Sequence, residues 1–345
     1  MTIELSAEER TAALAAGSAL LGARSVALTT HVNPDGDGLG SEVALAHLLR
    51  AKGIDAFIVN PTPTPARFGF LFQDLPGVDR TTEAVKALRK ADLICVLDIA
   101  DTGRLGNLGH AVAERGVPVV CVDHHASPGT LPPGPRYVDP TASATGELIY
   151  EMAIANGWPV TVPVARALYV ALVTDTGGFR FSNTHPRTLR IAADLLETGI
   201  DPESIYLDVY AGAPEGRPRL LADTLQTLVV EPEVGLAWVT VPSGAIERYG
   251  LTPDDLDGIV EHPRSVEGVK LALLFREMSG GRVKVSLRSV GDVNVAEFAH
   301  RFGGGGHSRA SGVALHGTLA EVQEKILGEA RDFLRTVEGG RIESK

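Results

Sequence analysis

The stretch Ser25-Val-Ala-Leu-Thr-Thr-His31-Val-Asn-Pro-Asp35-Gly-Asp37 indicates the fold of this chain. Its first half is apolar and rich in β-branched residues, which predicts a buried strand. Its second half places an imidazole and two carboxylates where that strand would end. Gly36 lets the backbone turn tightly, so that both carboxylates can face one site. The alternative is a polar turn with an aspartate helix cap, because Asp-Gly is common in turns.

The same arrangement recurs twice further along the chain. Asp98 follows the apolar run 93–97, and Asp123-His124-His125 follows the apolar run 117–122. Helical patterns separate these strands at 40–52, 82–90 and 108–115. Strands that alternate with helices predict an α/β fold with a parallel sheet and right-handed crossovers. Ligands of such sheets bind beyond the carboxyl ends of the strands, so the three clusters are expected at one edge.

A metal centre is the first interpretation of these clusters. A fourth carboxylate, Asp175, closes the apolar run 167–174. Four carboxylates and two imidazoles in one cleft would be unpaired unless they bind metal ions. These candidate ligands are Asp35, Asp37, Asp98, Asp175, His31 and His124. Carboxylates mixed with imidazoles favour a pair of Mn²⁺ or Mg²⁺-like ions. Two such ions are the usual machinery for hydrolysing a phosphate ester.

Alternatives to metal binding exist for two of these clusters. Asp98 could simply cap a turn or helix at its strand end, and the Asp-His-His triplet could be a turn with incidental histidines. Consecutive residues point to different sides, so the triplet cannot supply three ligands to one ion. We therefore expect one ligand, one residue near the substrate and one carboxylate that orients a histidine.

Length and charge narrow the class of protein. A chain of 345 residues exceeds the usual size of a single core, so two domains are expected. The net charge of −11 disfavours binding to long nucleic acid but is compatible with a small nucleotide in a locally basic pocket.

Cys95 and Cys121 lie in apolar runs and are expected to be buried free thiols. Without a recognisable signal peptide or membrane-spanning run, a soluble cytoplasmic protein with no membrane partner is expected.

The pattern becomes β-rich after about residue 236, and this change predicts the second domain. We expect a catalytic domain over 1–211, a linker over 212–232 and a smaller α/β domain with a mixed sheet over 233–345. The start of this linker is placed at the segment 211–218, which contains Pro and Gly. The active site is expected in the cleft between the two domains.

A glycine-rich segment of the second domain is a candidate anion site. Successive glycines can turn backbone N–H groups toward an anion, and a histidine and an arginine follow them, so the candidates are Gly304, Gly305, Gly306, His307 and Arg309. The alternative is a flexible surface loop. Arg288 could clamp a phosphate or be a solvated charge at a strand end, and Arg180 is a candidate because it follows Asp175 closely.

These motifs together resemble the DHH phosphoesterase superfamily, in its DHH–DHHA1 branch. The resemblance rests on the order and spacing of His31-x-x-Pro34-Asp35-x-Asp37, Asp98, Asp123-His124-His125, Asp175 and the C-terminal Gly-Gly-Gly-Gly-His307. It spans roughly residues 20 to 335. The motif set is most similar to the bacterial nanoRNase/pAp-phosphatase group.

The resemblance implies a role for each motif residue. His31 and Asp35 would bind one Mn²⁺, and a second Mn²⁺ would be held by Asp37, His124 and Asp175. Asp98 would bridge both ions, with Mg²⁺ or Co²⁺ as alternatives to Mn²⁺. Asp123 would orient the cluster, and His125 would contact the scissile phosphate or the leaving group. The glycine segment, His307 and Arg309 would grip the rest of the nucleotide.

The expected function is hydrolysis of short nucleotides by a metal-activated hydroxide. Candidate substrates are RNA of two to five nucleotides, pApA-type dinucleotides and 3′-phosphoadenosine 5′-phosphate. One alternative is a stand-alone cyclic-di-AMP phosphodiesterase. An alternative of another class is a nucleotide-binding regulator with a structural metal site. The resemblance also leaves a homodimer possible.

Overall fold

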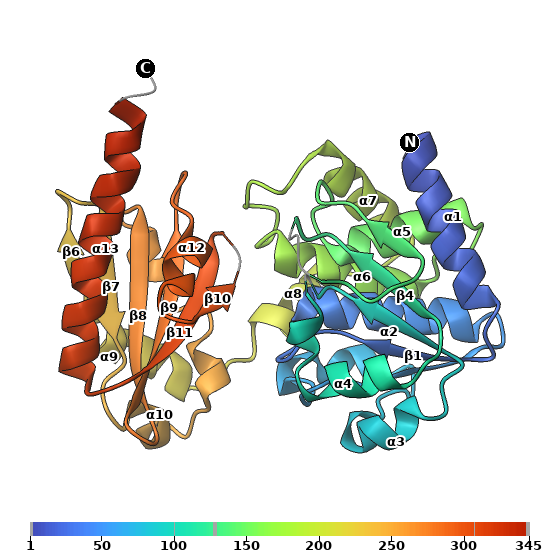
Figure 1. The fold of residues 1–345 in the computed structure, drawn as a ribbon, viewed down its shortest axis with the longest axis horizontal. Helices are drawn as coiled ribbons and strands as arrows, with labels where there is room; N and C mark the ends of the chain where they lie inside the picture. Colours follow the sequence, from blue (N-terminus) through green and yellow to red (C-terminus); the bar gives the residue numbers. More distant parts are fainter. Residues whose placement is uncertain (1–2, 100, 127–129, 307, 343–345) are drawn as a thin grey trace. The chain divides into compact units, whose positions relative to one another are not determined.

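The computed structural model describes residues 3–99, 101–126, 130–306 and 308–342, and contacts divide the chain into two units. One unit is Met1–Gly212 and the other is Ala213–Lys345. Each contains one β-sheet with helices on its faces (Figure 1). The expected α/β class is therefore confirmed for both parts of the chain.

The N-terminal unit is built on five parallel strands in the order β2-β1-β3-β4-β5. Their bounds are β1 Ser25–Thr29, β2 Asp55–Ile58, β3 Leu93–Leu97, β4 Val119–Asp123 and β5 Arg136–Val138. From β1 the chain first passes to β2 on one side and then returns to β3 on the other side. Such a reversal between neighbouring strands creates the crevice where α/β sheets bind ligands.

Helices cover both faces of this sheet. They are α1 Ala7–Leu21, α2 Gly36–Arg50, α3 Ala84–Leu88, α4 Asn107–Glu114, α5 Thr145–Ala155, α6 Val162–Asp175, α7 Pro186–Glu197 and α8 Pro202–Tyr210, with 3-10 turns η1 Ala66–Phe72, η2 Thr81–Glu83 and η3 Thr102–Leu105. The larger core joins one face of the sheet to α1, α2, α5 and α6. A smaller core joins the other face to α3 and α4.

Helix α2 begins at Gly36, four residues earlier than the sequence pattern predicted. Asp35 is its N-cap, and its Oδ1 atom accepts hydrogen bonds from the N–H groups of Asp37 and Gly38, both at 3.1 Å. An aspartate in this position satisfies amides that have no partner inside the helix. The loop after β1 is therefore short, and Asp37 lies in the first turn of the helix.

Glycines allow α2 and α6 to pack very closely. A Cβ atom added to Gly40 would lie 2.5 Å from the carbonyl oxygen of Ala167. A Cβ atom added to Gly36 would overlap the side chain of Thr174. This close approach brings the C-terminal end of α6, where Asp175 lies, beside the start of α2.

The C-terminal unit is built on a mixed sheet in the order β10-β11-β9-β8-β7-β6, as expected. The pair β7–β8 is parallel and the other pairs are antiparallel. The strands are β6 Val229–Glu231, β7 Leu236–Thr240, β8 Leu271–Met278, β9 Arg282–Ser289, β10 Gly305–Gly306 and β11 Ala310–His316. The turn at 279–281 joins β8 to β9 as the hairpin that the sequence predicted.

The helices of this unit also cover two faces. They are α9 Gly216–Leu225, α10 Ala245–Arg248, α11 Glu261–Arg264, α12 Val295–His300 and α13 Leu319–Ile342, with the 3-10 turn η4 Pro253–Leu256. One core joins the sheet to α12 and α13, and α13 runs along the sheet in Figure 1. The other core includes residues of α9, α10 and α11. The segment 212–232, expected as a linker, contains α9 and β6.

Both cysteines are buried as free thiols, as expected. Within the described part of the chain, no helix is both long enough and apolar enough to cross a membrane.

Candidate metal centre

Four parts of the N-terminal unit bring their polar side chains to one place. His31 and Asp35 lie between β1 and α2, and Asp98 directly follows β3. Asp123 ends β4 and is followed by His124 and His125, while Asp175 is the last residue of α6. The carboxyl ends of three neighbouring parallel strands and one helix end therefore meet, and all six expected metal ligands are together.

The described residues contain three groups that could each hold a metal ion. The expected ligands make up two of them, a first group of His31, Asp35 and Asp98 and a second group of Asp37, His124 and Asp175. Asp98, His124 and His125 form the third group. Within each group, one ligand atom of every residue lies within 4.8 Å of the others. The first and second groups have the members that the family resemblance implied, while the third places His125 within reach of an ion as well. Metal binding by these residues stays a prediction.

Asp98 lies between the two groups and offers one carboxylate oxygen to each. Its Oδ2 atom is 3.6 Å from Nε2 of His31, in the first group. Its Oδ1 atom is 3.5 Å from Nε2 of His124, in the second group. A carboxylate in this orientation can bridge two cations. Asp98 also has a positive φ of 55°, a backbone conformation that Asp and Asn tolerate better than most residues.

The two ligand histidines are oriented by backbone carbonyl groups. Nδ1 of His31 lies 2.8 Å from the carbonyl oxygen of Val32, and Nδ1 of His124 lies 3.2 Å from that of Ala142. Because a carbonyl oxygen only accepts, each Nδ1 atom carries the proton and each Nε2 atom presents its lone pair. In the described structure both Nε2 atoms are buried and lack a hydrogen-bond partner. A divalent cation is the partner that such buried lone pairs fit.

The pKa values of the clustered side chains also indicate a place that suits a divalent cation. Burial and the neighbouring carboxylate of Asp98 raise the pKa of Asp37 well above its usual range. Burial, together with Asp98 and Asp35, also raises the pKa of Asp175. Burial opposes charge on His31, yet the neighbouring carboxylates of Asp35 and Asp98 raise the pKa of its imidazole to about 10, so this place in the structure favours a positive charge. Carboxylates that compete for protons in this way would all be ionised beside a divalent cation.

Asp123 and His125 form a pair beside the two groups. Oδ1 of Asp123 lies 2.6 Å from Nδ1 of His125 and also accepts a hydrogen bond from the backbone N–H of His125, at 3.2 Å. Asp123 is buried. In the triplet, His124 thus has the geometry of a metal ligand, and the carboxylate of Asp123 orients the ring of His125.

Three residues near the site were not singled out from the sequence. The N–H groups of Thr145 and Gly146 donate to the carboxylate of Asp37, and Nδ2 of Asn183 lies 3.3 Å from Oδ2 of Asp175. Backbone amides carry no residue-type signal, so sequence patterns could not reveal the first two. Asn183 could have been noted as a polar residue eight positions after Asp175.

The glycine segment of the C-terminal unit is more ordered than a free loop. The N–H groups of Gly303 and Gly304 donate to the carbonyl oxygens of His300 and Ala299, so the expectation that successive amides face an anion is wrong for these two. A Cβ atom on Gly304 would overlap the carbonyl oxygen of Gly312, and one on Gly306 would lie 2.5 Å from that of Ala310. Close strand packing thus accounts for both glycines. His307 lies outside the described residues.

The three candidate arginines differ in their surroundings. Nε of Arg288 donates to Oε1 of Glu261 at 3.0 Å, so an incoming phosphate would have to displace this ion pair. Nη1 of Arg309 lies 3.5 Å from the carbonyl oxygen of Val293, at the long limit of a hydrogen bond. Nε of Arg180 donates to the carbonyl oxygen of Gly177 at 2.6 Å in the turn after α6. Substrate roles for all three stay predictions.

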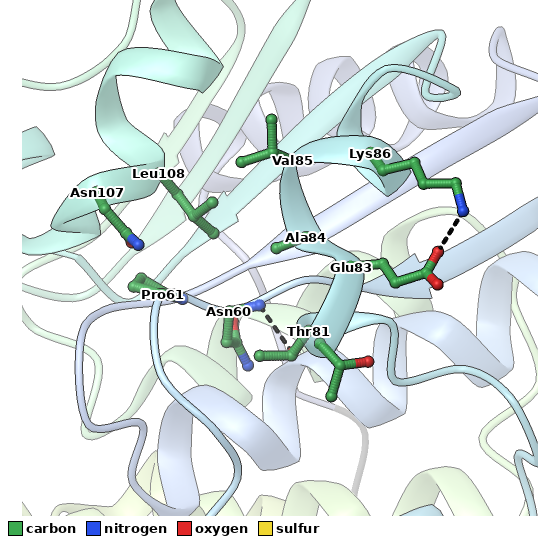
Figure 2. A pocket seen from close by; sticks show the side chains of 10 residues that line it. Asn60, Pro61, Thr81, Glu83, Ala84, Val85, Lys86, Asn107 and Leu108 are labelled. Atoms are coloured by element: carbon green, nitrogen blue, oxygen red, sulfur yellow. Dashed lines mark hydrogen bonds and ion pairs between the residues drawn. The ribbon is translucent and has the colours of Figure 1, made fainter.

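The N-terminal unit contains a cavity of about 460 Å³. Figure 2 shows the side chains that line it. Its described lining residues include none of the predicted site residues and are Asn60, Pro61, Thr81, Thr82, Glu83, Ala84, Val85, Lys86, Asn107 and Leu108. Two contacts stiffen its wall, one from the N–H of Asn60 to Oγ1 of Thr81 and one between Lys86 and Glu83. The metal-ligand cluster is thus separate from this cavity.

Comparisons with known proteins match both units. The model of the DHH family, N-terminal domain, matches residues 25–172, and the model of the DHHA1 domain matches residues 236–336. A Thermus thermophilus protein named bifunctional oligoribonuclease and PAP phosphatase NrnA is 32% identical, over 89% of this chain and 89% of its own length. A Bacillus subtilis protein of the same name is 29% identical, over 85% of this chain and 90% of its own length.

Solved structures agree with the fold. An exopolyphosphatase-related protein from Bacteroides fragilis has a TM-score of 0.88 at 26% identity, covering 97% of this chain and 100% of that chain. The exonuclease RecJ bound to manganese has a TM-score of 0.52 at 16% identity, covering 97% of this chain and 96% of that chain, and this likeness concerns the fold alone.

Proposed function

Because the chain belongs to the DHH family of phosphoesterases, in its DHH–DHHA1 branch, we propose that it hydrolyses phosphoester bonds in short nucleotides. The substrates would be RNA of two to five nucleotides, pApA-type dinucleotides or 3′-phosphoadenosine 5′-phosphate. Two relatives that match most of the chain are named as oligoribonucleases and PAP phosphatases, which supports this choice. The net charge of −11 also favours small substrates over long strands.

The observation that carries the proposal is the position of Asp98. One of its oxygens faces His31 in the first ligand group and the other faces His124 in the second. Two divalent cations held there, with Mn²⁺ as first choice, would lower the pKa of a water molecule and neutralise charge on the phosphate. His31 and Asp35 would hold one cation and Asp37, His124 and Asp175 the other.

His125 is the residue proposed to act on the substrate. Asp123 fixes its ring through Nδ1, which leaves Nε2 as the atom that can contact the phosphate or the leaving oxygen. In the C-terminal unit, Arg309 is the residue that would bind a second phosphate or the nucleoside.

A substrate panel tests the proposal. The full-length protein would be incubated with Mn²⁺ and each of pAp, pApA, cyclic-di-AMP and a five-nucleotide RNA, and the products would be separated by chromatography. We expect release of mononucleotides from pApA and the RNA, or of phosphate from pAp. Cleavage of cyclic-di-AMP in preference to all linear substrates would support the cyclic-dinucleotide phosphodiesterase instead. Tight binding of a nucleotide without hydrolysis of any would support the regulator.

A further inference from the structure

The start of α5 contacts two of the predicted metal ligands at once. The N–H of Thr145 lies 2.7 Å from Oδ2 of Asp37, and the N–H of Gly146 lies 2.9 Å from Oδ1 of the same carboxylate. The hydroxyl of Thr145 donates to Oδ1 of Asp98 at 3.2 Å. Thr145 has no exposed surface. One residue therefore links a carboxylate of the second ligand group to the carboxylate between the groups.

We propose that Thr145 is a positioning residue for the metal centre, acting through the orientation of Asp98 and Asp37. This inference rests on the proposed metal-dependent function. The hydroxyl binds the Oδ1 atom of Asp98, which is the oxygen that faces His124. Holding that oxygen fixes the rotation of the carboxylate, so the other oxygen stays directed at His31. Ligands of a metal site commonly need such outer partners to keep their geometry.

Asp37 is held by a complementary arrangement. The residue before α5, Ala144, has no side chain that could cap the helix, and the carboxylate of Asp37 takes that place from another helix. The first amides of a helix need an acceptor, and the helix dipole favours a negative charge there. Asp37 is thus oriented by both of its oxygens, while Ser41 adds a longer contact of 3.3 Å from its hydroxyl to Oδ1.

The start of α5 is itself rigidly placed. A Cβ atom on Gly146 would overlap the methyl group of Ala171 on α6, so the two helices are in close contact. The next residue, Glu147, is fully buried and accepts hydrogen bonds from Nε of Arg187 and from the hydroxyl of Ser143, both at 2.6 Å. A rigid support allows the Thr145 hydroxyl to determine where the Asp98 carboxylate lies.

The test is Thr145→Val, which removes the hydroxyl but keeps the side-chain shape and the backbone N–H. Mn²⁺ would be titrated into the metal-stripped full-length protein and followed by calorimetry. We expect the affinity of the sites for Mn²⁺ to fall about tenfold or more. In the presence of saturating Mn²⁺, kcat on the preferred nucleotide should fall while KM changes little. Thr145→Ser keeps the hydroxyl and should restore most of the Mn²⁺ affinity.

Thr318→Val is the control. Thr318 lies in the C-terminal unit, and its hydroxyl also binds a carboxylate, Oε2 of Glu321 at 2.8 Å, but that carboxylate belongs to none of the candidate metal groups. We expect this variant to lose stability and to keep wild-type Mn²⁺ affinity. If Thr145→Val does not fold, Thr145→Ala is measured in the same way.

The proposal is overturned if the variant without the hydroxyl binds Mn²⁺ as the wild type does, if Thr318→Val loses as much affinity, or if Thr145→Ser does not recover it. The Mn²⁺ titration needs no substrate. A wild-type protein that hydrolyses no nucleotide would contradict the proposed function, while the metal affinities would still decide the role of Thr145.

Discussion

The Nδ1 atom of His125 lies 2.6 Å from Oδ1 of Asp123 and 3.4 Å from Oδ1 of Asp98. The shorter contact is the hydrogen bond, so Asp123 determines which ring nitrogen carries the proton. His125 is thereby held in one orientation beside the ligand groups. The chemistry of this pair can be tested separately from metal binding.

Asp123→Asn should reduce kcat by about 10² to 10⁴ while KM and the number of bound Mn²⁺ ions stay the same. An asparagine keeps the shape but can donate to Nδ1 and so favour the wrong tautomer, which in another His–Asp pair costs about 10⁴ in kcat. Steady-state kinetics and Mn²⁺ calorimetry measure the two effects. Asp101→Asn is the control, because Asp101 caps a turn through the N–H groups of Gly103 and Thr130. Equal losses in both variants would refute the orienting role.

Asp98→Asn should lower kcat/KM by at least about a hundredfold and weaken Mn²⁺ binding, because one of two oxygens that face separate ligand groups becomes an amide nitrogen. The measurement is hydrolysis of the preferred nucleotide over a range of added Mn²⁺. Wild-type rates in this variant would show that the two-metal mechanism is wrong. Unchanged nucleotide binding without any wild-type hydrolysis would instead indicate a regulator.

Arg309→Ala should raise KM about tenfold and lower kcat less, if the guanidinium binds a phosphate or the nucleoside. Its 3.5 Å contact with the carbonyl oxygen of Val293 is weak and easily exchanged for a ligand. Arg301→Ala removes an exposed arginine of the same unit that pairs with Glu297, and it should leave both constants unchanged. An unaltered KM for every candidate nucleotide in Arg309→Ala would remove this assignment.

Glu151→Gln should make the thermal stability less dependent on pH. Burial raises the pKa of Glu151 to about 7, and the side chain accepts a hydrogen bond from the hydroxyl of Tyr137. The folded protein thus keeps a proton that the unfolded chain releases, so this contribution is present below about pH 4.5 and is lost as pH rises through about 7. A glutamine mimics the protonated form and still offers an oxygen to Tyr137.

The expected gain for Glu151→Gln is about 3 kcal/mol at most at pH 8, with little change at pH 5. Melting temperatures measured from pH 5 to pH 8.5 give the comparison. Glu197→Gln changes an exposed glutamate of the same unit and should follow the wild-type curve. Parallel curves for the wild type and Glu151→Gln would contradict the raised pKa.

Gly40→Ala should lower the stability by about 1–3 kcal/mol and weaken Mn²⁺ binding. The added methyl group would lie 2.5 Å from the carbonyl oxygen of Ala167, so α2 and α6 must separate, and these helices carry Asp37 and Asp175. Gly328→Ala in α13 meets no atom within 4 Å and should instead stabilise the protein by about 0.5–1 kcal/mol. A neutral Gly40→Ala would show that the close helix packing is not needed.

The sequence was sufficient for the three neighbouring strands β1, β3 and β4 and for the cluster at their ends, but it did not predict the edge strand β5. Apolar runs followed by His31, Asp98 and Asp123 predicted strand ends, and neighbouring parallel strands necessarily bring those ends together. The order of the motifs also identified Asp175, which lies at the end of α6 rather than after a strand. Asp175 comes close to the other candidate ligands because α2 and α6 pack tightly at Gly40, a contact between segments far apart in sequence.

Other features could not be predicted, because they depend on backbone groups or on ion pairs between residues that are distant in sequence. The amides of Thr145 and Gly146 hold Asp37 whatever their side chains are, and the early start of α2 depends on the cap geometry of Asp35. The pairing of Arg288 with Glu261 joins positions 27 residues apart and leaves no local pattern.

The left-handed backbone at Asp98 restricts what natural variation can do to this protein. Asparagine is the substitution that shares the tolerance of aspartate for that conformation, and the two residues differ by one nucleotide in their codons. Under the proposed function, a single point mutation would therefore give a folded descendant that keeps its nucleotide-binding surface without the carboxylate that would bridge the two cations. An enzyme and a non-hydrolysing receptor for the same nucleotide would then be adjacent in sequence space, and gene duplication could preserve both.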